Sequence, residues 1–115
     1  MSGIYLCIPL VPPSVNHYVK HTRDGRHYVT KEAKAFKDAV RLFARGKSLR
    51  ADKYEVSFIV YLGKGQRGDP DNFCKVIGDA LKEAGVIHSD HNVRWIADKD
   101  RDWKNPRTEI TVKAL

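Results

Sequence analysis

The most informative part of the sequence runs from residue 69 to residue 85 and reads DPDNFCKVIGDALKEAG. Pro70 suits the first position of a helix, Asp69 suits the N-cap before it, and Gly85 ends the pattern. Apolar residues recur every three or four positions between them, which predicts an amphipathic helix with one buried face: Phe73, Val76, Ile77, Ala80, Leu81 and Ala84.

A second helix is predicted before this one. Thr30 can cap it, and the pattern ends near Gly46. One face is apolar and comprises Phe36, Ala39, Val40 and Phe43. The opposite face is basic and includes Lys34, Lys37, Arg41 and Arg45.

Strands are predicted on both sides of the helices. Residues 18–21 and 26–29 flank the turn pair Asp24-Gly25 and have hairpin character. Alternating apolar residues indicate four further strands, at 4–8, at 54–62, near 93–97 and near 108–112. Without a repeat or a linker, the sequence predicts one small α+β domain over residues 1–115, with a mixed β-sheet and two main helices.

Composition narrows the class of protein. The chain is 42% hydrophobic and 30% charged, which is a globular balance, and no apolar run approaches the roughly 20 residues of a membrane span. The start at Met1-Ser2-Gly3 does not resemble a signal peptide. Cys7 and Cys74 lie far apart, so we expect two ordinary thiols, no disulfide or zinc site, and a cytoplasmic location.

The positive charge is concentrated in one segment. Residues 17–50 contain ten Lys and Arg against three acids, a balance of +7 that equals the net charge of the whole chain. His and Tyr residues are interleaved there, as in a surface that follows a phosphate backbone. Solubility alone can also produce basic helices, so this feature only moderately favours nucleic acid.

Asp69 and Asp71 stand out in so basic a chain. Mg²⁺ prefers oxygen ligands and is usually held by a few carboxylates together with water and substrate phosphate. Asp71, Lys75 and Asp79 follow i, i+4, i+8 spacing and are predicted to share one helix face, where Lys75 would stabilise charge on a phosphate and Asn72 would orient a ligand. The pattern predicts a metal-dependent enzyme acting on a phosphate polymer.

Structural roles explain the same residues about equally well. An Asp before Pro is a common N-cap, acids favour the first helical turn, and the Asp71–Lys75–Asp79 ladder suits a solvated face. Asp90 after Ser89 suits a turn. His88 and His91 have the spacing of a zinc ligand pair, but no second pair completes such a site.

Taken together, these residues resemble the RusA family of Holliday junction resolvases, small endodeoxyribonucleases of prophages and phages. The specific part is Asp69-x-Asp71-Asn72-x-x-Lys75. The similarity also includes an earlier and a later set of residues: Pro12-Pro13-Ser14-Val15-Asn16 with Tyr18, and Asp79-Ala80-Leu81 with Ala84-Gly85 and Asp90. The chain departs from the family pattern at Gly68 and Pro70, which leaves the matched acids intact.

The resemblance implies the roles of the site residues. Asp69, Asp71 and Asp90 match the family's metal-binding carboxylates, and Lys75 matches its essential lysine. It also implies an intertwined homodimer that uses Mg²⁺, or Mn²⁺ in its place, to nick two opposed strands of a four-way DNA junction in recombination and repair. The expected location is then the cytoplasm of a bacterium or of a phage-infected host. We expect DNA contacts from six basic residues: Lys20, Arg23, Arg26, Lys31, Lys34 and Arg67.

Two other functions compete with this interpretation. A non-catalytic nucleic-acid-binding module would explain the basic segment and treat the acids as helix caps. A phosphohydrolase with an Asp-x-Asp motif is less compatible, because its first Asp should directly follow a buried strand and here a Gly/Lys/Arg-rich loop intervenes.

Overall fold

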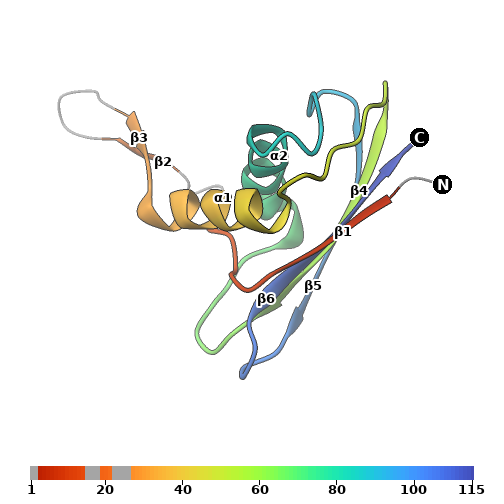
Figure 1. Ribbon diagram of the computed structural model, residues 1–115. Helices are drawn as coiled ribbons and strands as arrows, with labels where there is room; N and C mark the ends of the chain where they lie inside the picture. The colour runs from red at the N-terminus through yellow and green to blue at the C-terminus, as the bar shows by residue number, and fades with distance from the viewer. Residues whose placement is uncertain (1–2, 15–18, 22–26) are drawn as a thin grey trace.

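The computed structural model describes residues 3–14, 19–21 and 27–115 (Figure 1). Four strands form one sheet in the order β1-β6-β4-β5. Their bounds are Gly3–Ile8 for β1, Tyr54–Leu62 for β4, Val93–Arg101 for β5 and Arg107–Ala114 for β6. A separate two-stranded ribbon joins β2 (Val19–His21) and β3 (His27–Val29).

The main sheet is mixed. β6 lies between β1 and β4 and is antiparallel to both. β4 and β5 are parallel, with Leu62 opposite Arg101 at their carboxyl ends. Parallel neighbours need a long crossover, and here the crossover contains a helix that packs on the sheet.

Both helices cover the same face of this sheet (Figure 1). α1 spans Lys31–Phe43, and the Thr30 hydroxyl caps it by accepting a hydrogen bond from the Ala33 amide. α2 spans Cys74–Glu83. The core lies between the helices and the sheet, and its largest fully buried side chains include Tyr54, Phe36, Phe58, Phe73 and Leu6.

The mixed α+β architecture predicted from the sequence is confirmed, and so are the predicted strands. The strand predicted near 93–97 is longer and continues to Arg101, so the alternating charges after Ala97 belong to an edge strand. The hairpin predicted around Asp24-Gly25 exists as β2 and β3, while its turn lies outside the described residues. Phe43 is predicted to lie on the apolar face of the first helix, but it is the last residue of α1 and its side chain is 45% exposed.

The start of the second helix differs from the prediction. Residues Pro70–Phe73 form a 3₁₀ turn, and α2 begins only at Cys74. Asp69 precedes this turn, but its side chain makes no capping hydrogen bond. The tighter turn shifts Asp71 out of the α-helical register that the i, i+4, i+8 spacing assumed.

None of the helices in the described ranges lies on the other face of the sheet (Figure 1). Strand pairing aligns four residues across it in one row: Tyr5, Thr111, Ser57 and Ile96. Tyr5 on β1 is 55% exposed and Ile96 on β5 is 45% exposed, so this face has apolar side chains open to solvent on both of its edge strands. None of the described helices is long and apolar enough to span a membrane.

Candidate metal and phosphate site

The candidate site lies where β4 and β5 end. Because these strands are parallel, their carboxyl ends meet at the same edge of the sheet, and the loops that follow are neighbours (Figure 1). The loop after β4 leads to Asp69, while Lys99 and Arg101 lie among the last three residues of strand β5.

Asp69 is largely exposed and pairs with a lysine from the neighbouring strand. Lys99 Nζ lies 3.5 Å from Asp69 Oδ1 and donates a 3.1 Å hydrogen bond to the Gly68 carbonyl. The Asp69 side chain is 74% exposed. Asp69 therefore points its carboxylate at a cation from β5 and not at the amides of its own helical turn.

Gly68 fixes the position of Asp69. Its φ of +150° lies in a region that favours glycine, and an added Cβ would approach the Phe73 ring to 2.4 Å. Phe73 is fully buried and cannot move aside. The loop before the acid therefore packs directly on the core, which explains why this chain has a glycine here.

A pocket of about 460 Å³ adjoins Asp69. Its lining combines one carboxylate with several hydrogen-bond donors and cations: Ser14, Leu62, Arg67, Gly68, Asp69, Asn72, Lys99 and Arg101. Three of these residues are basic, so the pocket suits a phosphate group beside the carboxylate. The Asn72 amide was expected to orient a ligand, and it does line this pocket.

Lys99 and Arg101 were not among the predicted site residues. Their alternation with Asp98, Asp100 and Asp102 indicates only a charged strand. The parallel pairing of β4 with β5 brings them to Asp69, and that pairing is a long-range property of the fold.

Asp71 is exposed and lies close to Cys74. Burial raises the pKa of the Cys74 thiol, and the negative charge of Asp71 raises this pKa further. The thiol therefore stays protonated near neutral pH and is a poor nucleophile. Cys7 and Cys74 are both free thiols; Cys7 is exposed and Cys74 is half-buried.

Lys75 pairs with one of its two predicted partners. Its Nζ lies 3.3 Å from Asp79 Oδ1, one turn along α2. The Lys75 side chain is 60% exposed, so it can exchange this partner for another anion at little cost.

Asp90 lies against the middle of α2. An added Cβ on Gly78 would be 3.8 Å from the Asp90 Cβ and 3.2 Å from the ring of Trp95. The missing side chain at Gly78 thus lets the 87–92 loop and β5 approach the helix that carries Lys75. This contact places Asp90, the third predicted metal-binding carboxylate, beside α2, the helix that follows Asp69 and Asp71.

The described residues contain no group of three His, Cys, Asp or Glu side chains arranged to hold a metal. His88 and His91 accordingly form no such site there. Mg²⁺ requires fewer protein ligands, since one or two carboxylates with water and substrate phosphate suffice. The exposed oxygen donors of Asp69 and Asp71 fit this chemistry, and a lysine ammonium already lies beside Asp69.

The predicted DNA-contacting residues fall into two groups. Lys31 and Lys34 are exposed on α1, and Arg67 lines the pocket beside Asp69. Arg23, Arg26 and the Lys20 side chain lie outside the part of the chain that the structure describes.

Comparison with known families decides the class of the protein. Residues 9–113, nearly the whole chain, match the model of the endodeoxyribonuclease RusA family. The chain belongs to the RusA family. A search of curated proteins found no match. Membership in RusA assigns the chain to a family of endonucleases that act on Holliday junctions, and the Asp69 pocket is the place where that chemistry can be sought.

Proposed function

We propose that this RusA protein is a divalent-metal-dependent endonuclease that resolves Holliday junctions by paired, symmetric nicks. The observation that carries the proposal is the exposed Asp69 carboxylate beside a pocket lined by Arg67, Lys99 and Arg101, in a chain of the RusA family. Acids and bases placed together in this way suit a cation and a phosphate bound side by side.

Asp69 and Asp71 would hold the metal, with Asp90 as a further carboxylate. The cation, Mg²⁺ or Mn²⁺, would neutralise the scissile phosphate and lower the pKa of a bound water. Arg67 and Lys99 would hold the DNA backbone at the pocket, and Lys75 would leave Asp79 to stabilise negative charge that develops on the phosphate. Lys31 and Lys34 on α1, together with Lys20, Arg23 and Arg26, would hold the arms of the junction.

The proposal includes a homodimer. A four-way junction has approximate two-fold symmetry, and a C₂ dimer presents identical sites to two equivalent strands. The face of the sheet that the described helices leave open, with Tyr5 and Ile96 exposed on its two edge strands, offers apolar side chains to the second copy.

The alternative is a nucleic-acid-binding module without catalysis. Its support is the lack of a three-ligand metal cluster among the described residues, together with the excess of +7 over residues 17–50. Such a module would bind the junction and leave it intact in Mg²⁺.

The test is a cleavage assay on a synthetic mobile four-way junction and a matched linear duplex. With Mg²⁺ we expect the wild type to nick the junction symmetrically and leave the duplex intact. Asp71→Asn should lower the nicking rate by roughly 10³-fold or more, because a metal ligand is lost. It should bind the junction as tightly as the wild type or more tightly, because a negative charge near phosphate is removed.

Asp52→Asn is the matched control, since Asp52 is also exposed but lies before β4, away from the pocket lining. The control should nick at the wild-type rate. Normal nicking by Asp71→Asn would refute the assignment, and junction binding without nicking by the wild type would favour the binding module.

A further inference from the structure

The turn between β5 and β6 displays a tryptophan to solvent. Trp103 is 63% exposed, among the most exposed large apolar side chains in the described chain. Exposing an indole forgoes the free energy that burying it would contribute, roughly 25 cal/mol per Å² of apolar surface. Nothing in the proposed cleavage chemistry uses Trp103.

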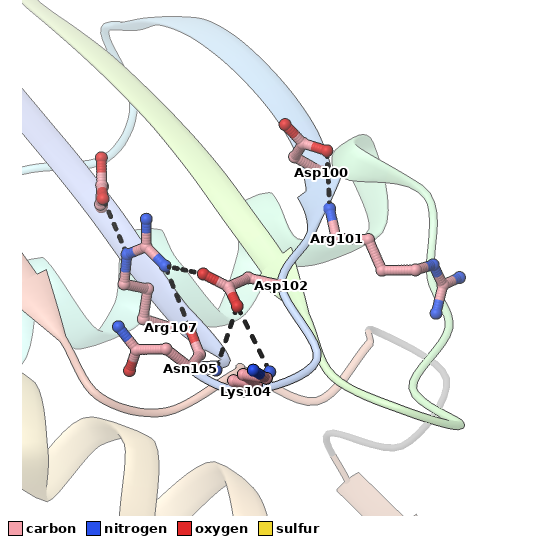
Figure 2. A network of polar contacts seen from close by, with 7 residues as sticks. Asp100, Arg101, Asp102, Lys104, Asn105 and Arg107 are labelled. Carbon is pink, nitrogen blue, oxygen red and sulfur yellow. Dashed lines mark hydrogen bonds and ion pairs between the residues drawn. The ribbon is translucent and has the colours of Figure 1, made fainter.

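The turn that carries Trp103 is held in one shape by side chains. The Asp102 carboxylate accepts hydrogen bonds from the amides of Lys104 and Asn105, at 3.3 and 3.2 Å (Figure 2). It also accepts a 2.9 Å bond from Arg107, which donates in turn to the Asn105 carbonyl at 3.1 Å. These hydrogen bonds connect residues on both sides of Trp103, so they hold the turn in one conformation.

The Arg107 side chain is itself held in place by two further contacts. Its Nε donates a 2.8 Å bond to Glu109, and its guanidinium stacks 3.9 Å above the Tyr61 ring. The turn is also attached to the end of β4, because the Asp102 amide donates to the Leu62 carbonyl at 3.0 Å. Trp103 is thus an exposed aromatic side chain on a turn that hydrogen bonds hold in one conformation.

The β5–β6 turn lies at the same end of the sheet as the loop after β4, which leads to Asp69 (Figure 1). Arg101 lines the pocket beside Asp69 and precedes Trp103 by two residues, a span of at most about 7 Å along the chain. Residues 99–107 contain four basic residues and two acids, Asp100 and Asp102, for a local charge of +2. Asp102 is already paired with Arg107.

We infer that Trp103 stacks on the exposed face of a base pair at the branch point of the junction. At a branch point the stacking of base pairs along each arm is interrupted. The flat face of the last base pair can then contact a side chain, whereas in a continuous duplex the next base pair covers it. A rigid aromatic side chain beside cations is the arrangement that stacks on bases while phosphates are held nearby. The inference rests on the proposed function and adds a contact that recognises the branch.

The test measures binding without cleavage, by fluorescence anisotropy in EDTA. The substrates are a four-way junction and a linear duplex whose ends are closed by loops. Trp103→Ala should weaken junction binding roughly tenfold and change duplex binding less than twofold, in line with the contribution of one stacked base. Trp103→Phe should retain most of the affinity, because it keeps an aromatic face.

Phe43→Ala is the matched control, because it removes another exposed aromatic, at the end of α1. It should leave the preference for the junction unchanged. The inference fails if Trp103→Ala binds the junction normally, or weakens junction and duplex equally. It also fails if Trp103→Ala alters the oligomeric state in sedimentation, since Trp103 would then contact a second copy.

The two proposals fail separately. If the wild type does not nick the junction in Mg²⁺, the proposed activity is wrong, while the EDTA experiment still decides whether Trp103 recognises the branch. If the wild type nicks and Trp103→Ala binds as the wild type does, only the stacking contact is wrong.

Discussion

Asp69 occupies the position of a helix cap without acting as one. Its carboxylate makes no hydrogen bond to the following turn and instead faces Lys99 on the parallel neighbour of β4. Capping would have used up the oxygens that a metal needs. The structural alternative to a functional Asp69 is therefore weaker in the folded chain than in the sequence.

Lys99 and a metal ion should compete for Asp69, because both are positive. The shape-conserving change Lys99→Met should tighten Mn²⁺ binding up to about fivefold, since an exposed ion pair contributes about 0–1 kcal/mol. It should also weaken DNA binding and reduce the slope of log affinity against log salt by about one, as expected for one lost phosphate contact. Electron paramagnetic resonance of free Mn²⁺ measures the first effect and a salt titration measures the second.

Lys82→Met is the control for this change, because Lys82 is an exposed lysine in the last turn of α2. It should leave both the Mn²⁺ affinity and the salt slope unchanged. Weaker Mn²⁺ binding by Lys99→Met would show that Lys99 supports the metal site and does not compete for it.

Local sequence patterns predicted which segments form helices and strands. The alternation in 54–62 and the apolar stripe of 73–84 both appear as predicted. The 3₁₀ turn at 70–73 was missed because an apolar stripe does not distinguish it from the first turn of an α-helix. The pocket around Asp69 was missed for another reason: it depends on β4 pairing in parallel with β5, which no local pattern encodes.

The β5–β6 turn makes a specific prediction about pH. The hydrogen bond from Arg107 lowers the pKa of Asp102 below its ordinary value of 3.8. A lowered pKa means that the ionised carboxylate stabilises the fold above pH 3.8, and that this contribution is lost as pH falls through the lower, folded value. Amide chemical shifts of Lys104 and Asn105, followed by NMR, should therefore titrate with a midpoint below 3.8.

A variant separates the Arg107 contact from the backbone contacts of Asp102. Arg107→Lys removes the two-sided hydrogen bonding of the guanidinium and its stacking on Tyr61, so the midpoint should rise toward 3.8. A midpoint at or above 3.8 in the wild type would contradict the network of Figure 2.

The helices that the structure describes cover one face of the main sheet and leave the other open (Figure 1). The open face has a pocket of about 250 Å³ whose lining includes Tyr5, Ile59, Ile96, Asp98 and Glu109. A mixed sheet that leaves apolar side chains exposed on an open face has surface available for a partner. The row of Tyr5, Thr111, Ser57 and Ile96 runs across all four strands, so a second copy could bury the whole width of the sheet.

We predict that Ile96→Asp converts the proposed dimer to a monomer. Ile96 is 45% exposed in the single chain, so the substitution should barely affect folding, whereas a carboxylate inside an interface lacks a partner and is costly. Sedimentation equilibrium should give a dimer for the wild type and a monomer for Ile96→Asp, and the monomer should nick single strands without pairing the two cuts.

Leu42→Asp is the control, because Leu42 is 67% exposed on α1 and its charged variant should remain dimeric. The opposite result, a monomeric Leu42→Asp and a dimeric Ile96→Asp, would place the interface on the helical side and leave the open sheet free to contact DNA.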